Sequence, residues 1–305
     1  MIKLIEKKLE KIPILNLLVR FGKKIKIPGL QGMSLYDVLE MYTIGIVKGA
    51  LTTRAGGIAY SFFMAIFPFL LFLLTLIHYI PIDGFQEALM LLITESLPPK
   101  TLGAVQPILD DIIKNQNNGL LSFGFIASIF LMTNGVNAIF GGFEYSYHVK
   151  EVRSVVRAYV ISLGTSLVMT LFLVVTVALT ILYGVGLGKL KAEGWLEDDL
   201  FWLQSGSGLL FVFMVFTIVS MLYHYGTKQG KQSSFFSPGA IFTTILSVFT
   251  FYLFGIYVVQ FSKYNELYGS IGTLLILMLF VWLNAIILLL GFELNATINR
   301  LKHKK

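Results

Sequence analysis

The hydrophobic and polar positions of this 305-residue chain alternate on the scale of whole helices. Six runs contain no Lys, Arg, Asp or Glu, and each is 26 to 31 residues long: 55–82, 115–143, 158–188, 200–227, 232–262 and 267–292. A helix needs ~20 apolar residues to cross the ~30 Å hydrocarbon layer of a bilayer. Each run is therefore long enough for one crossing and too short for two. The pattern predicts an all-α polytopic membrane protein with six transmembrane helices, because a β-barrel would show alternating segments of ~10 residues.

The predicted organisation has three parts. Residues 1–53 are a basic amphipathic segment whose helices lie at the cytoplasmic interface, and Ser34 and Asp37 have the spacing of a capping box that opens one of them. Residues 54–300 form the six-helix transmembrane domain, and residues 301–305 are a basic cytoplasmic tail. The expected spans are about 55–80, 119–147, 158–187, 203–226, 237–261 and 270–296, with a long outer loop over 81–118.

Composition agrees with a lipid environment. The chain is 56% hydrophobic and only 13% charged, with a mean hydropathy of +0.77. Soluble domains average about 25% charged residues, so this chain has too few charges to cover a water-facing surface. It has no cysteine, which excludes disulfides and thiolate chemistry.

The positive charges predict the orientation. Of the 24 Lys and Arg residues, 19 lie in the N-terminal segment with the adjoining Arg54, in the second and fourth loops, and in the tail with the adjoining Arg300, and the other loops hold five. The positive-inside rule then places both termini in the cytoplasm, with the chain in a bacterial plasma membrane and no cleavable signal peptide at its start. Topology explains the net charge of +7, so anionic inner-leaflet lipid at the basic N-terminus is the expected partner, and nucleic acid is not expected.

Polar residues on the second span form a stripe. At 100° per residue, five side chains fall within roughly 80° of one another: Asn134, Asn137, Gly141, Glu144 and His148. A polar stripe that faces lipid is costly, so it should face the bundle interior. Two interpretations stay open at this point, a water-filled cavity and hydrogen bonds between helices.

The last span carries a second set of polar residues. Asn284, Gly291 and Asn295 share one stripe, and Glu293 lies roughly opposite Asn284. Glu144 and Glu293 both lie near the inner ends of their spans, where each either serves proton coupling or pairs with Arg153, Arg157 or Arg300. The candidate substrate path consists of Asn134, Asn137, Glu144, Asn284, Glu293 and Asn295.

Small and turn-forming residues are candidates for structural or gating roles. Ala55, Gly56, Gly57 and Ala59 should let a neighbouring backbone come close, and Pro68 should kink the first span. A tight outer turn precedes the last span. The gating candidates are Gly56, Gly57, Pro68, Tyr264, Asn265, Tyr268, Gly269 and Gly272.

Catalytic motifs are absent from the sequence. It contains no H-E-x-x-H or H-x-H-x-D, no G-x-x-x-x-G-K-[ST] and no G-x-S-x-G. A catalytic metal site, ATP use and a hydrolase elbow are therefore not expected. The expectation is a protein that is not an enzyme and has no cofactor.

Three segments resemble the YihY/BrkB family of bacterial inner-membrane proteins. They are RAGGIAYSFFMAIFPFLLFLLTLI, NAIFGGFEYSYHVKEVRS and the stretch from SPGAIFTTILSVF to LLLGFELNA, which includes the turn YNELYGSIG. The resemblance covers nearly all of residues 40–300. It implies six spans, cytoplasmic termini and a plasma-membrane location.

What the resemblance implies about function is broader. The family has carried the labels "ribonuclease BN" and "virulence factor BrkB", and members have been linked to lipid or lipopolysaccharide export. The first expectation is a transporter or flippase-like protein for a lipid or amphiphilic envelope component. The alternatives are a non-transporting membrane scaffold for envelope partners and, less favoured, a membrane-associated ribonuclease. The partners considered besides lipid are a second copy of the chain and an envelope protein.

Overall fold

The computed structural model describes residues 21, 23–26, 34–76, 118–149, 151–193, 199–228, 230, 234–260 and 270–302. The first 20 residues, nearly all of the predicted outer loop and the turn residues Tyr264, Asn265, Tyr268 and Gly269 lie outside the described residues.

The described part of the chain contains seven helices of 14 residues or more, which confirms the all-α class: α3 (Leu35–Lys48), α4 (Leu51–Leu76), α7 (Asn118–Glu144), α8 (Val155–Ala192), α9 (Asp199–Gly226), α10 (Pro238–Gln260) and α12 (Ser270–Lys302). Within the described residues, α7, α8, α9, α10 and α12 are long and apolar enough to cross a membrane. α4 occupies the first predicted span with 26 residues, but the side chains of 67 and 69–76 are not described. The sixth crossing and the location of the termini stay predictions.

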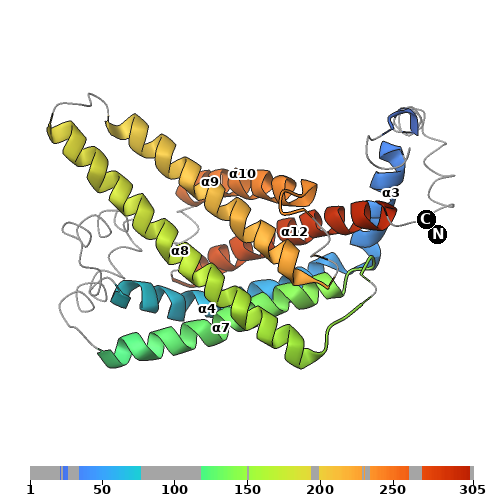
Figure 1. Cartoon of the computed structure of the whole chain (residues 1–305), viewed down its shortest axis with the longest axis horizontal. Coiled ribbons are helices and arrows are strands. Elements are labelled where there is room, and N and C mark those ends of the chain that lie inside the picture. The colour runs from blue at the N-terminus through green and yellow to red at the C-terminus, as the bar shows by residue number, and fades with distance from the viewer. Residues whose placement is uncertain are drawn as a thin grey trace.

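The six long helices close a ring in chain order (Figure 1). α4 packs on α7, α7 on α8, α8 on α9, α9 on α10, α10 on α12, and α12 returns to α4. This order follows from connectivity, because consecutive helices are usually neighbours in space. α7 also contacts α9 and α12 across the ring, and α3 packs on α12.

α3 begins at the predicted capping box. The Ser34 N–H and Oγ donate to Asp37 Oδ2 at 2.9 and 2.7 Å, and the Asp37 N–H donates to Ser34 Oγ at 3.3 Å. The box satisfies N–H groups that the first helical turn leaves without a partner, so the prediction is confirmed. Ala50, with φ of 46°, turns the chain from α3 into α4.

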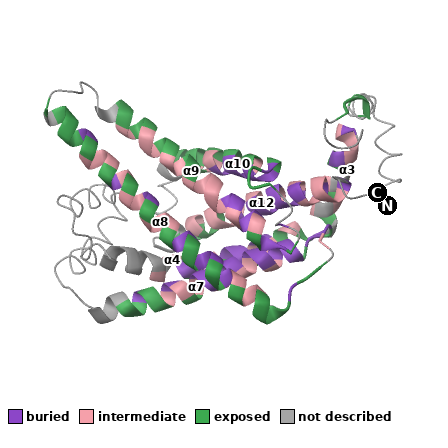
Figure 2. Cartoon of the chain, viewed as in Figure 1, coloured by how far each residue is buried: buried purple, intermediate pink, exposed green. Residues whose placement is uncertain are grey.

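Most buried residues gather at one end of the ring (Figure 2). We call it the packed end: the first halves of α4, α8 and α10 and the second halves of α7, α9 and α12. Its centre is aromatic, with Phe143 stacked on Phe292 at 4.2 Å between ring centroids and Tyr223 edge-on to Phe143 at 5.6 Å. The opposite halves, the open end, leave more of their apolar surface exposed.

Small residues allow close packing, but not all at the predicted positions. Ala55 and Ala59 are buried, whereas a Cβ at Gly56 or Gly57 would meet nothing within 4 Å, so the close approach expected there is absent. The tightest approach is between α10 and α12, where a Cβ on Gly291 would overlap Thr243. α4 is helical on both sides of Pro68.

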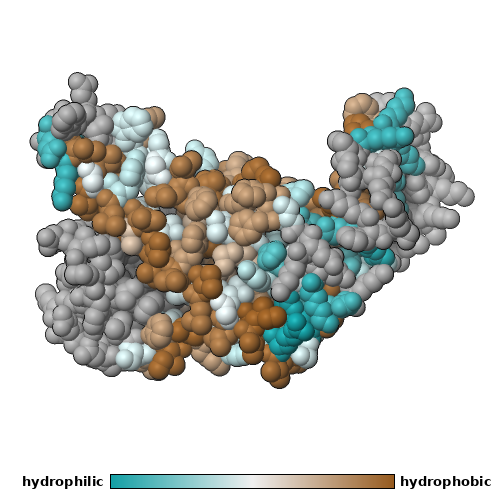
Figure 3. All heavy atoms as spheres, viewed as in Figure 1, coloured by the Kyte–Doolittle hydropathy of each residue, from teal (hydrophilic) through white to brown (hydrophobic). Residues whose placement is uncertain are grey.

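The exposed surface suits a bilayer. Figure 3 shows apolar residues across the middle of the visible face and hydrophilic residues gathered towards its two ends. The exposed apolar side chains include Val168, Phe213 and Ile245, on α8, α9 and α10. Such a belt is what lipid contact predicts for a multi-pass protein.

Candidate functional site

A buried ion pair joins two helices at the packed end. Arg54, from the first turn of α4, places Nη2 at 2.8 Å from Glu293 Oε1 on α12. The Arg54 side chain is 7% exposed and the Glu293 side chain 0%. Charges this deeply buried require partners, because an unpaired one pays the full cost of leaving water.

α7 and the turn that follows it supply those further partners. Arg54 Nη1 donates to the Gly142 carbonyl at 2.7 Å, and Ser146 Oγ donates to Glu293 Oε2 at 2.8 Å. We call these four residues the Arg54–Glu293 cluster. It links α4, α12 and the end of α7 through charge-assisted hydrogen bonds, which are the stronger kind.

A phenol from α3 lies near the cluster. Burial, and then the charge of Glu293, raise the pKa of Tyr42 to about 12. A phenol is neutral at pH 7 in any case, and the raised pKa keeps Tyr42 uncharged in alkaline solution as well, so it adds no second negative charge beside Glu293. α3 thus supplies part of the surroundings of the buried carboxylate, because it packs on α12.

The partner of Glu293 differs from the three arginines expected from the sequence. Arg153 and Arg157 lie just before and within α8, and Arg300 lies on α12 itself, so local position suggested them. Arg54 is 239 residues away along the chain and drew attention only as an orientation charge. Its position at the start of a span was the available signal, but only the ring closure of α12 on α4 brings the two side chains together.

Glu144 has one of the partners expected from the sequence. Arg153 Nε lies 3.7 Å from Glu144 Oε1, and the Arg153 backbone N–H donates to Glu144 Oε2 at 3.4 Å. Both side chains are buried. Burial lowers the pKa of Arg153, and the Glu144 charge opposes that shift.

The predicted stripe on the second span holds only in part. α7 ends at Glu144, so His148 lies in the following turn, where its Nδ1 is 3.1 Å from Arg300 Nη1. A stripe of five on one helix was therefore wrong for His148. Asn137 Oδ1 accepts a hydrogen bond from Ser162 of α8 at 3.3 Å, which matches the interhelical alternative. Asn134 is half-buried on the same helix.

The stripe on the last span is also divided. Asn295 Oδ1 accepts from the Gly239 N–H at 2.8 Å and its Nδ2 donates to Ser237 Oγ at 2.8 Å, so this side chain caps α10. Asn284 Nδ2 instead donates to the Phe280 carbonyl of its own helix at 2.9 Å. The candidate path residues whose hydrogen bonds are described thus make separate contacts, some between helices and some within one helix.

The sequence did not predict one set of hydrogen bonds between helices, which we call the Tyr223 tie. Tyr223 of α9 donates from its hydroxyl to the Leu288 carbonyl at 2.7 Å and lies 2.6 Å from Thr243 Oγ1. It joins α9, α10 and α12 directly beside the aromatic core. Its place at the end of the fourth span was visible in the sequence, but an interfacial tyrosine belt explains that position equally well.

The arrangement supports the packing of helices on one another rather than a catalysed reaction. The cluster, the Asn295 cap and the Tyr223 tie all lie at the packed end, where they hold α12 to its neighbours. Within the residues that the structure describes, no group of three or more His, Asp or Glu side chains is placed to hold a metal ion.

Comparison with known proteins gives concordant matches. Residues 45–305 match the family described as Virulence factor BrkB. The chain is 33% identical over 258 residues to YfkH of Bacillus subtilis, whose name marks it as ribonuclease-like; the match covers 82% of this chain and 90% of that protein. It is 25% identical over 246 residues to a UPF0761 membrane protein of Coxiella burnetii, a match that covers 78% of this chain and 84% of that protein. It is 27% identical over 262 residues to a UPF0761 membrane protein of Vibrio campbellii, a match that covers 82% of this chain and 78% of that protein. No solved structure matches.

Proposed function

The chain belongs to the Virulence factor BrkB family, and from this premise we propose that it moves a lipid or amphiphilic envelope component across a bacterial plasma membrane. In this proposal the protein acts as a transporter or flippase-like carrier without covalent chemistry. The packed end faces the cytoplasm, as the positive-inside rule predicts, and the Arg54–Glu293 cluster is its inner gate.

The observation that carries the proposal is the fully buried ion pair between α4 and α12. A buried pair is a poor device for stability alone, because well-packed apolar residues of similar volume often serve as well or better. Ionisable residues inside a membrane domain more often mark pathways and switches. Breaking the pair would free α12 from α4 and α7 at the end where the ring is closed.

The uneven packing of the ring supports the same proposal. Burial is concentrated at the packed end, and the open end has fewer buried side chains in the described helices. Alternating access needs a bundle that is closed at one end and can open there when the other end closes. The polar ties at the packed end are the contacts that such a change would exchange.

Lipid translocation in proteoliposomes tests the proposal. A fluorescent lipid is added to vesicles, and its movement between leaflets is followed by chemical quenching of the outer leaflet. Wild type should show flux, and Glu293→Gln should lose flux per folded protein, with both samples normalised to the monodisperse fraction recovered because the substitution also lowers stability. Glu151→Gln is the matched control, because Glu151 makes an exposed ion pair with Lys228 at 3.5 Å.

Two outcomes would overturn the proposal. No flux from folded wild-type protein would remove the transport function and favour a scaffold for envelope partners. Equal loss of yield and flux in Glu293→Gln would show that the pair is structural and that the gate lies elsewhere.

A further inference from the structure

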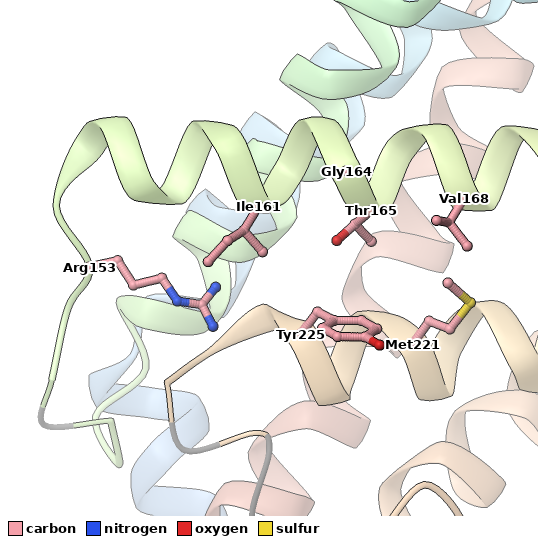
Figure 4. A pocket seen from close by; sticks show the side chains of 7 residues that line it. All are labelled: Arg153, Ile161, Gly164, Thr165, Val168, Met221 and Tyr225. Atoms are coloured by element: carbon pink, nitrogen blue, oxygen red, sulfur yellow. The ribbon is translucent and has the colours of Figure 1, made fainter.

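A cavity of about 420 Å³ lies between α8 and α9 at the packed end, apart from the Arg54–Glu293 cluster. Figure 4 shows Arg153 projecting from the connection before α8 into the space between the two helices. The other side chains line the walls, from α8 on one side and α9 on the other. They are Ile161, Gly164, Thr165, Val168, Met221 and Tyr225.

The polar end of the cavity has an unused donor. The Arg153 side chain is 3% exposed, and its Nη1 has no hydrogen-bond partner within the described part of the chain. Buried donors are almost always satisfied, so an orphan on a guanidinium indicates a missing acceptor. Glu144 Oε1 lies 3.7 Å from Nε, and the Phe140 ring lies 5.9 Å from Cζ, so neither contact supplies an acceptor for Nη1.

The charge around this end favours an anion. Arg153 and Arg157 carry two positive charges, and Glu144 carries one negative charge against them. Arg157 is near enough to lower the pKa of Arg153, so the two cations share one electrostatic environment. A planar guanidinium binds phosphate oxygens through paired N–H donors.

The rest of the cavity is apolar and open at the side. Ile161, Gly164 and Val168 follow one face of α8 over roughly 10 Å, at about 1.5 Å per residue. Val168 is 52% exposed and Tyr225 40% exposed, so the cavity opens towards the surface that lipid would cover. Gly164 provides the width, because a Cβ there would meet nothing within 4 Å.

We propose that this cavity binds one membrane lipid through its phosphate headgroup at Arg153, with an acyl chain along the apolar wall between α8 and α9. Thr165 and Tyr225 add hydroxyl groups farther along the cavity, beyond Ile161 (Figure 4). A free phosphate ion would leave the apolar wall unused, which is why the lipid is the occupant. The inference rests on the proposed function and identifies an anionic phospholipid as the amphiphile class that the ring handles.

Lipid retention measures how fully the cavity is occupied at equilibrium, and it does not require the protein to move lipid across the membrane. The full chain is placed in nanodiscs of equal phosphatidylglycerol and phosphatidylcholine, and lipids that stay bound after gentle release are counted by native mass spectrometry. Both lipids carry a phosphate, but Arg153 and Arg157 repel the choline cation of phosphatidylcholine, so wild type should retain one phosphatidylglycerol with about tenfold or greater preference. Arg153→Gln should lose the preference, and Gly164→Leu should lose the retained lipid.

Two control variants separate the site from general effects. Gly186→Leu makes the same change on α8 at a glycine that also has open space around it, and should retain the lipid as wild type does. Lys189→Gln removes one exposed positive charge in the last turn of α8, away from the cavity, and should keep the preference. Arg153→Gln also removes the ion-pair partner of Glu144 and can therefore fail to fold. In that case the retention measured for Gly164→Leu decides whether the cavity binds lipid.

Three results would overturn the site: no preference in wild type, unchanged retention in Gly164→Leu, or displacement of the lipid by millimolar inorganic phosphate. The last would identify a site for free phosphate. Retention without flux would refute the proposed transport alone, and flux without retention would refute this site alone.

Discussion

Replacing Glu293 by Gln should lower the free energy of unfolding by about 3–5 kcal/mol, the usual result of removing one partner from a buried ion pair. The gross Coulomb attraction at the 2.8 Å separation is about 6 kcal/mol for an effective dielectric constant near 20. Part of this is offset in the native protein by desolvation of both groups. Gln keeps an acceptor for Ser146, so the loss comes from the Arg54 charge left without its counter-ion.

A double-mutant cycle separates this explanation from a simple loss of packing. Arg54→Gln should cost a similar amount, because it leaves the Glu293 carboxylate uncompensated with 0% exposure. The double variant should cost clearly less than the two single losses together, since no buried charge then remains. The coupling should be at least about 1–3 kcal/mol.

Reversible unfolding in mixed micelles, titrated with a denaturing detergent and followed by tryptophan fluorescence, supplies the four free energies. The reasoning fails if the single losses add to within about 0.5 kcal/mol, which is the behaviour of independent sites. It also fails if either single variant loses less than about 1 kcal/mol. Glu151→Gln at the exposed pair should change stability by no more than about 1 kcal/mol.

Three further predictions use matched positions. Asn295→Ala should lower the free energy of unfolding by about 1–2 kcal/mol because it removes hydrogen bonds between α10 and α12, whereas Asn284→Ala should lower it by under about 0.5 kcal/mol because its bond lies within one helix. The unfolding assay described above compares the two variants. Gly291→Ala should lower the free energy of unfolding by about 1–3 kcal/mol or more because it overpacks the contact with Thr243, whereas Gly208→Ala, which has open space around it, should leave the melting temperature unchanged or raised. Equal losses of stability in the two variants would contradict the packing argument. Ser34→Ala should cost about 1 kcal/mol and speed amide exchange in the first turn of α3 about fivefold, and unchanged exchange would show that the capping box is dispensable.

Features that depend only on residues close together in the chain could be predicted from the sequence. Charge-free runs long enough for one crossing predicted the helices, because lipid excludes charges and demands internal backbone hydrogen bonding. The capping box of Ser34 and Asp37 depends on four consecutive residues, so it could be recognised without a fold. The Glu144–Arg153 pair spans nine residues across one turn, which local position also suggested.

Side-chain partners across the ring were not readable in the same way. The periodicity of a helix shows which residues share a face, but not which neighbour that face meets. Asn284 and Asn295 share a stripe, yet one bonds to its own helix and the other caps α10. The helix end at Glu144 moved His148 off its predicted stripe, because element boundaries are the weakest part of a pattern argument.

The sequence by itself determined the class of protein, the helices and the distribution of charge between loops, since each of these depends on composition and spacing along the chain. Only the tertiary structure decided that α12 closes on α4, because that contact joins residues 239 apart through packing that no local pattern encodes. The same closure turned Arg54 from an orientation charge into the partner of Glu293. The packing of α8 against α9 likewise placed Arg153 at the end of an apolar cavity, where its unpaired Nη1 has a physical consequence.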